Sequence, residues 1–442
     1  MGFWSKLYKG YGMVIILLLL SLFYSWRTLH EQFPVGKKAA DSVAELAMRR
    51  FQPNDSLLII ADTDPVSQEF LLRLEERMNQ MNFTNFRKIV GDPPEIREGL
   101  AGLPLPPKAI LTTREITQWR LIRTLTEKFP EMSGTEIISA PSYLWPDFLK
   151  MSNMLAIADR TVVIAIIAIG MTIVIITGGI DLSVGSLIAW SAVLCTAIIQ
   201  RRGGESASTA SMLLAMLATL AICLVLGLIN GLFVAKAKVA AFIVTLAVMM
   251  AARGHAFIMS KGQSIYELPE AFTGLGRGDV WGVPNTVILL VIMYVLAYVL
   301  MNKTLLGRWF YAVGGNAEAA RLAGVPVSKV LIASYLISAF CAGVGGVIQA
   351  SQLKSGAPTY GVSFEMYAIA AVVIGGTSLS GGTGKILGTL IGAMVIAVIQ
   401  NGMNLTGVES YTQQVVLGLV ILGSVLVDKF KSAALHGSVR RV

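Results

Sequence analysis

Long apolar runs alternate with short polar segments from about residue 159 to residue 427. Most of these runs are long enough for a helix that crosses a bilayer core of about 30 Å. The pattern predicts nine such spans, and a tenth near residues 11–26 that is short for this thickness. The nine are expected near residues 161–177, 183–199, 211–235, 240–260, 285–301, 331–351, 364–374, 386–405 and 412–427.

The stretch from residue 28 to about residue 146 has a different pattern, because it is charged, carries prolines and contains no run of spanning length. Short apolar runs predict strands, and amphipathic stretches between them predict helices. The alternation of strand and helix predicts a small α/β domain with a parallel sheet. The strands are expected at 57–61, 86–90, 108–112 and 136–139, and the helices at 65–82 and 116–129.

Asp62 and Asp64 directly follow the first of these strands. Ligand sites of α/β domains often lie at the ends of strands. Two acidic residues in one turn are also the usual caps of a following helix, and capping is the simpler interpretation.

The N-terminal apolar run follows Lys6 and Lys9 and lacks the small-residue pattern of a signal-peptide cleavage site. An uncleaved first span at residues 1–27 is expected, with a signal peptide as the alternative. In either case the positive flank places the following segment outside the cytoplasm. The organisation is therefore a first helix, an inserted extracytoplasmic domain at 28–146, and a membrane core at 147–442.

Composition agrees with a membrane protein, since 54% of the 442 residues are hydrophobic and only 14% are charged. Soluble domains carry about 25% charged residues. In a ten-span arrangement with both termini inside, the short inner segments hold thirteen lysines and arginines, against five in the short outer loops. This asymmetry follows the positive-inside rule, and it explains the net charge of +9 without nucleic acid.

Residues 305–330 form a polar, glycine-containing segment between apolar runs, which this arrangement places in the cytoplasm. Asn316 is a good N-cap, and Glu318 and Arg321 suit the two ends of a helix dipole. Gly324 followed by Pro326 marks the end of this helix. Two interpretations fit the residues alone: a helix that rests on its own protein, and a helix that docks a partner.

Two glycine-rich segments, Gly178–Gly185 and Gly375–Gly382, share the pattern Gly-Gly-x-x-Leu-Ser-x-Gly. Each follows a span that runs inward, which suggests a weak internal repeat of the kind common in transporters. Asp181 is a charge near the membrane, so both a functional role and capping of the next helix are open. Residues 381–385 do not form a Walker loop, because Leu379 and Ile386 occupy positions that require glycine and a hydroxyl residue.

Other polar residues interrupt the predicted spans. They either line a polar path or form hydrogen bonds between helices, and both interpretations fit the sequence. These residues are Asn230, Gln349, Gln400, Asn401 and Asn404. Arg253 is expected to snorkel or to pair with a polar neighbour. The three cysteines and three histidines are scattered, so no disulfide framework or metal cluster is expected.

Four motifs together resemble the permease subunits of ribose-type ABC importers for monosaccharides. They are GMTIVIITGGIDLSVGS at 170–186, LGR at 306–308 with GGNAEAARLAGV at 314–325, AIAAVVIGGTSLSGGTG at 368–384, and NGMNLTGV at 401–408. The resemblance covers the first span and essentially everything from residue 143. It implies a ten-helix permease that forms a dimer, either with a second copy of itself or with a related permease. It also implies two cytoplasmic ATPase subunits and an extracytoplasmic solute-binding protein as partners.

The block at about residues 28–141 departs from that family, whose members run from the first span almost directly into the segment that matches Leu144–Ala158. The resemblance implies that ATP binds to the partner subunits, so no cofactor, metal or catalytic residue is expected in this chain. The residues expected to couple to the ATPase are Asn316, Glu318, Ala319, Ala320, Arg321 and Gly324. The residues expected to line the translocation pathway are Gly179, Asp181, Ser183, Gly376, Ser378 and Ser380.

The sequence therefore predicts a mainly α, polytopic protein of the bacterial inner membrane that imports a monosaccharide or similar polar solute. An ion-coupled carrier is the first alternative, but apart from Asp181 the spans offer almost no carboxylates. A membrane sensor with an outer ligand domain is the second, although the tail after Lys429 is too short for an output domain. No nucleophile, base or metal set suggests an intramembrane enzyme.

Overall fold

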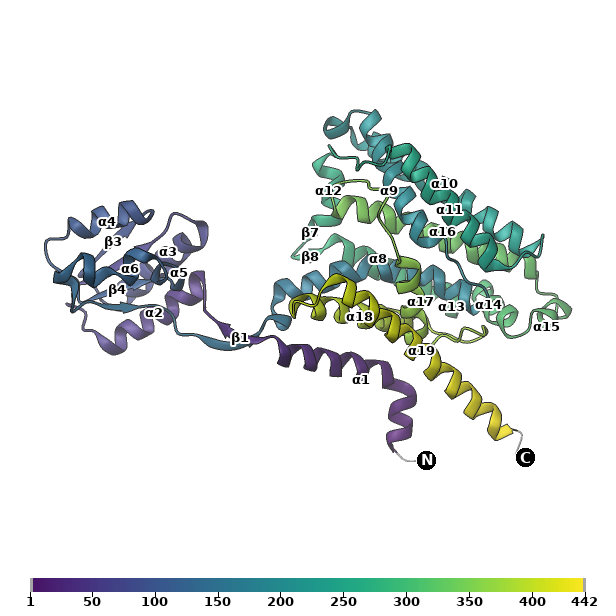
Figure 1. Cartoon of the computed structure of the whole chain (residues 1–442), viewed down its shortest axis with the longest axis horizontal. Helices are drawn as coiled ribbons and strands as arrows, with labels where there is room; N and C mark the ends of the chain where they lie inside the picture. Colours follow the sequence, from purple (N-terminus) through teal and green to yellow (C-terminus); the bar gives the residue numbers. More distant parts are fainter. Residues whose placement is uncertain (1–2, 440–442) are drawn as a thin grey trace. The chain divides into compact units, whose positions relative to one another are not determined.

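The computed structural model describes residues 3–439, with side-chain surroundings for residues 12–426. The chain forms two compact units (Figure 1). One unit comprises residues 1–28 and 147–442, and we call it the membrane unit. The other is Leu29–Pro146, and we call it the inserted unit.

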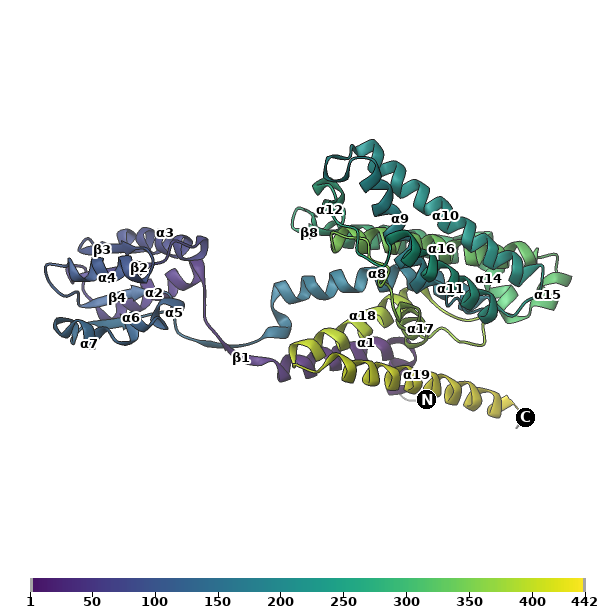
Figure 2. The same ribbon diagram turned by 45° about the horizontal axis from the view of Figure 1, so that its top comes forward.

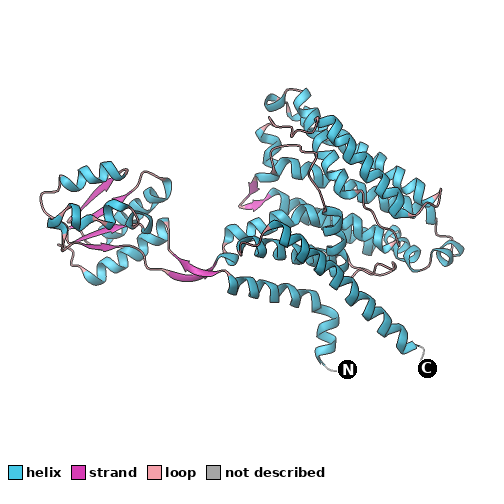
Figure 3. Cartoon of the chain, viewed as in Figure 1, coloured by secondary structure: helices cyan, strands magenta, loops and turns pink. Residues whose placement is uncertain are grey.

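The inserted unit contains the predicted parallel sheet, with strand order β3-β2-β4-β5. All five residues of β2 are buried, because Leu57, Ile59 and Ala61 face one apolar core while Leu58 and Ile60 face another. Helices cover both faces, as a parallel sheet requires (Figure 3). The strands are β2 Leu57–Ala61, β3 Phe86–Val90, β4 Ala109–Thr112 and β5 Glu136–Ile138, and the first two covering helices are α2 Gly36–Arg50 and α3 Pro65–Gln80.

The second expected helix, at residues 116–129, is wrong as a single element. The chain there forms three short helices, α5 Arg114–Thr117, α6 Arg120–Arg123 and α7 Leu125–Lys128. Trp119 adopts an extended conformation and Thr124 leaves the helical region, and both interrupt the hydrogen-bond ladder. The inserted unit also contains α4, Pro93–Ala101, and a separate antiparallel ribbon of β1, Leu29–Gln32, and β6, Tyr143–Pro146.

The membrane unit is a bundle of helices, shown from two directions in Figures 1 and 2. Among the described residues, seven helices are long and apolar enough to cross a membrane. They are α8 Met151–Ile176, α9 Val184–Arg201, α10 Thr209–Ala235, α11 Ala241–Ser260, α13 Asn285–Lys303, α16 Val327–Gln352 and α18 Ile386–Leu405. Three shorter apolar helical stretches, Gly12–Arg27, Phe364–Ile374 and Ser410–Leu426, coincide with the other three predicted spans.

The centre of the bundle is α8, which is the most buried of these helices, whereas only 28% of the apolar stretch of α10 and of α11 is buried. α16 packs against α8, α9 and α10. Glycines allow helices to pack this closely: between α16 and α9, a side chain at Gly346 would collide with the Ile188 carbonyl, and between α18 and α17 (Phe364–Ile374), a side chain at Gly392 would collide with the Ala371 carbonyl. The bundle is completed by α1 Phe3–Arg27, α12 Glu270–Arg277, α17 Phe364–Ile374, α19 Ser410–Val439 and a small hairpin of β7 Asp279–Val280 and β8 Val283–Pro284.

Candidate functional site

The polar segment at 305–330 contains two helices rather than the single one expected from its caps. α14, Leu305–Gly315, comes first, and α15, Ala317–Leu322, follows after Asn316. The Asn316 side chain accepts a hydrogen bond from the Ala319 N–H at 2.9 Å, as expected of an N-cap. Gly324 has φ +83°, and the Val325 N–H bonds to the Ala320 carbonyl at 3.0 Å, which closes the C-terminus.

α15 is anchored by one side chain and exposed elsewhere. Ala320 is 6% exposed and belongs to the main apolar core, whereas Glu318, Ala319 and Arg321 are exposed and Leu322 is 76% exposed. Glu318 accepts a hydrogen bond from the Arg321 guanidinium at 3.1 Å, and this bond lowers the pKa of the Glu318 carboxyl. The helix therefore presents an ion pair and an apolar side chain on a free surface.

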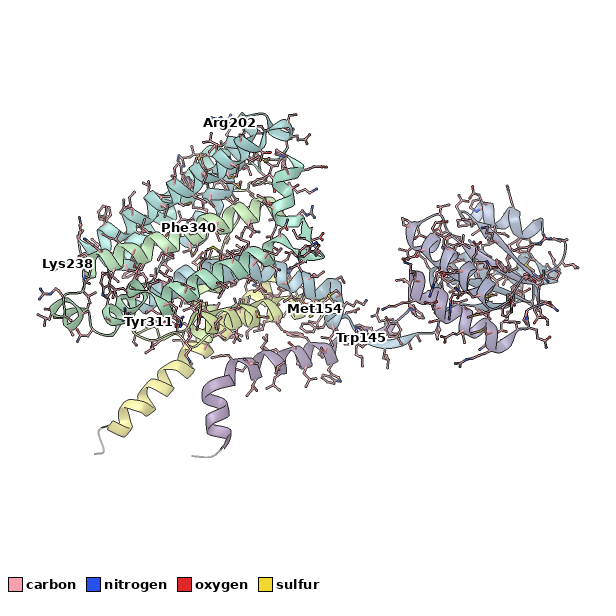
Figure 4. The ribbon with its side chains drawn as sticks, turned by 180° about the vertical axis from the view of Figure 1, so that it is seen from behind. Trp145, Met154, Arg202, Lys238, Tyr311 and Phe340 are labelled. Carbon is pink, nitrogen blue, oxygen red and sulfur yellow. The ribbon has the colours of Figure 1, made fainter. Side chains whose placement is uncertain are left out.

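α14 connects α15 to both glycine-rich loops. The Gly314 backbone lies so close to the Ile176 carbonyl and the Gly382 N–H that an added Cβ would overlap both. The Gly382 N–H donates to the Ile176 carbonyl at 2.9 Å, and the Tyr311 hydroxyl donates to the Gly384 carbonyl at 2.9 Å. Figure 4 shows Tyr311 and Lys238 at one end of the bundle. The two loops with the shared pattern thus meet beside the helix that precedes α15.

In the first loop, Asp181 is fully buried and belongs to a hydrogen-bonded cluster. One carboxylate oxygen accepts from the Ser183 N–H at 2.9 Å and the Ser183 hydroxyl at 2.5 Å, and the other accepts from the Ser338 hydroxyl of α16 at 2.7 Å. The Asn230 amide of α10 donates to the Ser183 hydroxyl at 3.1 Å. Asp181 therefore bonds to Ser183, the residue before α9, and it ties the loop directly to α16 and, through Ser183, to α10.

The predicted pathway residues fall into two environments. In the first loop Asp181 and Ser183 are buried and Gly179 is half-buried, with its Cα facing the Tyr335 hydroxyl of α16. In the second loop Gly376 and Ser380 are exposed and Ser378 is half-buried, and the Ser380 N–H bonds to the Ser378 hydroxyl at 3.3 Å. The structure brings the two loops together at Gly381 and Gly178 but does not place all six residues on one surface.

The polar residues inside the spans separate into the two classes that the sequence left open. Asn401 and Asn153 exchange amide hydrogen bonds at 2.8 and 3.1 Å, and Asn404 accepts from the Gln413 amide at 2.9 Å. Gln349 and Gln400 instead line a cavity. The Arg253 guanidinium donates to the Pro358 and Tyr360 carbonyls, as expected for a paired arginine.

The sequence did not predict that Asp159 and Arg160 line the same cavity. Both residues lie at the polar start of a span, where charged side chains are expected at the membrane interface. Nor did the sequence predict the close approach at Gly314. The pair Gly314-Gly315 before Asn316 is compatible with a close backbone contact. A glycine pair alone does not indicate which segment makes that contact.

Comparison with known proteins places these features in a family. The chain is 42% identical to the ribose import permease protein of Escherichia coli K12 over 299 residues, which cover 67% of this chain and 91% of that protein. It is 44% identical to the ribose import permease protein of Bacillus subtilis 168 over 294 residues, covering 66% and 89%.

The L-arabinose transport system permease protein of Escherichia coli K12 is 36% identical over 289 residues, covering 65% of this chain and 86% of that protein. No solved structure gives a significant match.

Residues 153–425 match the family described as branched-chain amino acid transport system, permease component. This match lies wholly within the membrane unit and leaves the inserted unit outside it. The chain therefore belongs to this family of multi-pass permeases, and within it the ribose-type ABC importers are its relatives.

Proposed function

We propose that this chain is the membrane-spanning permease subunit of an ABC importer that carries a monosaccharide across the bacterial inner membrane. The observation that carries the proposal is the 42–44% identity to ribose import permeases along nearly their whole length. The relative described as an L-arabinose permease supports the sugar class but does not select one sugar.

The partners follow from this assignment. ATP binds to a separate ATPase subunit on the cytoplasmic side, a solute-binding protein delivers the sugar from outside, and a second permease copy completes the pathway. Both termini lie in the cytoplasm, and the inserted unit lies outside. The excess of lysine and arginine in the short segments on the α15 side supports this orientation.

α15 is the contact with the ATPase, through Asn316, Glu318, Ala319, Arg321 and the exposed Leu322. Ala320 and Gly324 have a different task, since the first anchors the helix to the core and the second closes it. Closure of the ATPase subunits moves α15, and the rigid contact at Gly314 passes this movement to both glycine-rich loops. The exposed Gly376 and Ser380 and the half-buried Ser378 face the pathway, while Gly179, Asp181 and Ser183 hold their loop to the bundle.

The assignment of α15 is tested with Ala319→Arg and Leu322→Glu, which place charge on its exposed surface without disturbing Ala320. We expect ATPase co-purification and ATP-driven uptake to fall at least about tenfold, because an unpaired charge buried in an interface costs several kcal/mol. Uptake of labelled D-ribose and L-arabinose and capture of the ATPase are the measurements.

Ala319→Ser is the matched control, since it keeps the size and neutrality of the site and is expected to behave as wild type. Membrane insertion is followed in parallel. Normal ATPase capture and uptake in both charged variants would remove α15 from the interface.

A further inference from the structure

A polar cavity of about 480 Å³ lies among α8, α12, α16, α17 and α18, within the membrane unit. It occupies the end of the bundle remote from α15. α16 starts directly after α15, and Gln349 and Gln352 lie in its last turn, roughly 33 Å further along at 1.5 Å per residue. Figure 4 agrees, since Met154 in the first turn of α8 lies at the end opposite Tyr311 and Lys238.

The lining combines hydrogen-bonding side chains from four separate helices. Asp159 and Arg160 come from α8, Arg277 comes from α12, Gln349 and Gln352 come from α16, and Gln400 comes from α18. The Asp159 carboxylate accepts from the Thr286 hydroxyl at 2.7 Å through one oxygen, and the Gln352 amide donates to the Asp159 main-chain carbonyl at 3.4 Å. These contacts hold Asp159 and Gln352 in place and leave the second Asp159 carboxylate oxygen available to the cavity.

Helix packing does not account for Gln349 as it does for the asparagines. Asn230, Asn401 and Asn404 each bond to another side chain. Gln349 forms no side-chain hydrogen bond to the part of the chain that the structure describes, and yet it interrupts an apolar helix. A polar side chain in a membrane span is costly, so such residues usually mark a path for solutes.

The apolar part of the lining suits one class of ligand. The rings of Phe364 and Tyr367 lie 5.9 Å apart on α17, and Tyr367 lies within hydrogen-bonding reach of Gln400. A sugar presents hydroxyl groups that both donate and accept, together with a C–H face that packs on aromatic rings. The cavity volume falls within the range of about 300–1,000 Å³ typical of small-molecule sites.

We propose that this cavity, the polar pocket, is a binding station for a neutral monosaccharide after its release from the binding protein. The inference rests on the proposed function and adds a site to it. Gln349 and Gln400 hydrogen-bond the sugar hydroxyls, Asp159 accepts from one of them through its remaining oxygen, and the aromatic pair contacts the C–H face.

The test uses the complete transporter in proteoliposomes, with the ATPase subunit and the binding protein, and labelled D-ribose or L-arabinose. In the double variant Gln349→Leu with Gln400→Leu, we expect about tenfold fewer sugar molecules imported per ATP hydrolysed. The loss of two hydrogen bonds to the sugar is expected to weaken its binding by a factor of about this size. ATP hydrolysis stimulated by the binding protein is expected to stay near wild type, which shows that the variant folds and assembles.

Gln200→Leu is the matched control, because Gln200 is an exposed glutamine in the last turn of α9, outside the pocket. A second measurement uses Gln349→Cys and a membrane-impermeant thiol reagent. Cys195, Cys223 and Cys341 are buried, so background labelling is small. Millimolar D-ribose or L-arabinose is expected to slow labelling of the new thiol.

A wild-type ratio of sugar to ATP in the double variant, or labelling at an unchanged rate in the presence of both sugars, overturns the pocket while leaving the importer function standing. Failure of the wild-type transporter to import either sugar or any other monosaccharide with ATP overturns the proposed function, and the pocket with it.

Discussion

Gly314 shows how one residue determines a contact among three segments. Its backbone lies against the Ile176 carbonyl and the Gly382 N–H, and no side chain fits between them. The next residue, Gly315, has open space around the position of an added Cβ. Two adjacent glycines in the same helical turn therefore have different tasks, and only Gly314 is required by packing.

We expect Gly314→Ala to displace the glycine-rich loops and to lower both stability and uptake. Overpacking of a close contact typically costs about 1–3 kcal/mol. The measurements are the thermal midpoint of the purified permease and ATP-driven sugar uptake. Gly315→Ala is the matched control and is expected to change neither. Equal behaviour of the two variants would show that the contact at Gly314 is unimportant.

At the scale of elements, helix ends in both units are set by local chemistry. Asp64 accepts hydrogen bonds from the Val66 and Ser67 N–H groups at 2.9 and 3.1 Å and so caps α3. The Asp62 carboxylate accepts from the Thr63 N–H at 2.6 Å and, more weakly, from the Thr63 hydroxyl at 3.3 Å, while the Asp62 main-chain carbonyl accepts from the Gln68 amide at 2.8 Å. Capping, the simpler of the two interpretations of this acidic pair, therefore describes Asp64.

We expect Asp64→Ala to weaken α3 by about 0.5–2 kcal/mol, the usual value of an N-cap. Hydrogen bonds from Ser67, first through its side chain, lower the pKa of the Asp64 carboxyl in the folded protein. The cap therefore stabilises the fold fully above the unfolded pKa of about 3.9, and this contribution is lost as pH falls through the lower folded pKa.

Amide hydrogen exchange over residues 65–80, corrected for the intrinsic pH dependence, measures this effect. The variant should exchange faster than wild type at pH 6, and the difference should shrink in strong acid. Asp62→Ala is the control and should exchange as wild type. Similar exchange in the two variants would contradict the cap.

At the scale of the whole molecule, the inserted unit enters and leaves the membrane unit at adjacent positions. The Asp147 N–H donates to the Thr28 carbonyl at 2.9 Å, and the Phe148 N–H donates to the Thr28 hydroxyl at 3.1 Å. The inserted unit has its own apolar cores on the two faces of its sheet. Domains inserted through neighbouring ends commonly fold by themselves.

We expect residues 29–146 to fold as an isolated protein, with one cooperative thermal transition by circular dichroism. We also expect the permease to insert and remain monodisperse when these residues are replaced by a short Gly-Ser linker. Ile59→Asp in the isolated unit is the control for a packed core and should abolish the transition, since Ile59 is fully buried. A non-cooperative wild-type unit, or an aggregated linker variant, would show that the two units depend on each other.

Local patterns in the sequence were sufficient for the spans, for the parallel sheet, and for the caps of α15. These features depend on apolar periodicity and on hydrogen bonds within one or two turns, both of which can be read from neighbouring residues. Two helices of the inserted unit, α2 and α4, lie outside the elements predicted from the sequence. The Asp92 and Glu95 capping box before α4 was readable, whereas the buried face of α2 is mostly alanine and gives a weak apolar signal.

The tertiary structure alone decided which polar residues share a surface. Residues 349 and 400 are on different helices, and only the packing of α16 and α18 around α8 brings them to one cavity. In the same way, packing directs Ala320 into the core and leaves Ala319 exposed, and it joins the two glycine-rich loops at Gly314. Contacts between distant segments depend on the orientation of whole helices, and the local pattern of residues carries little information about that orientation.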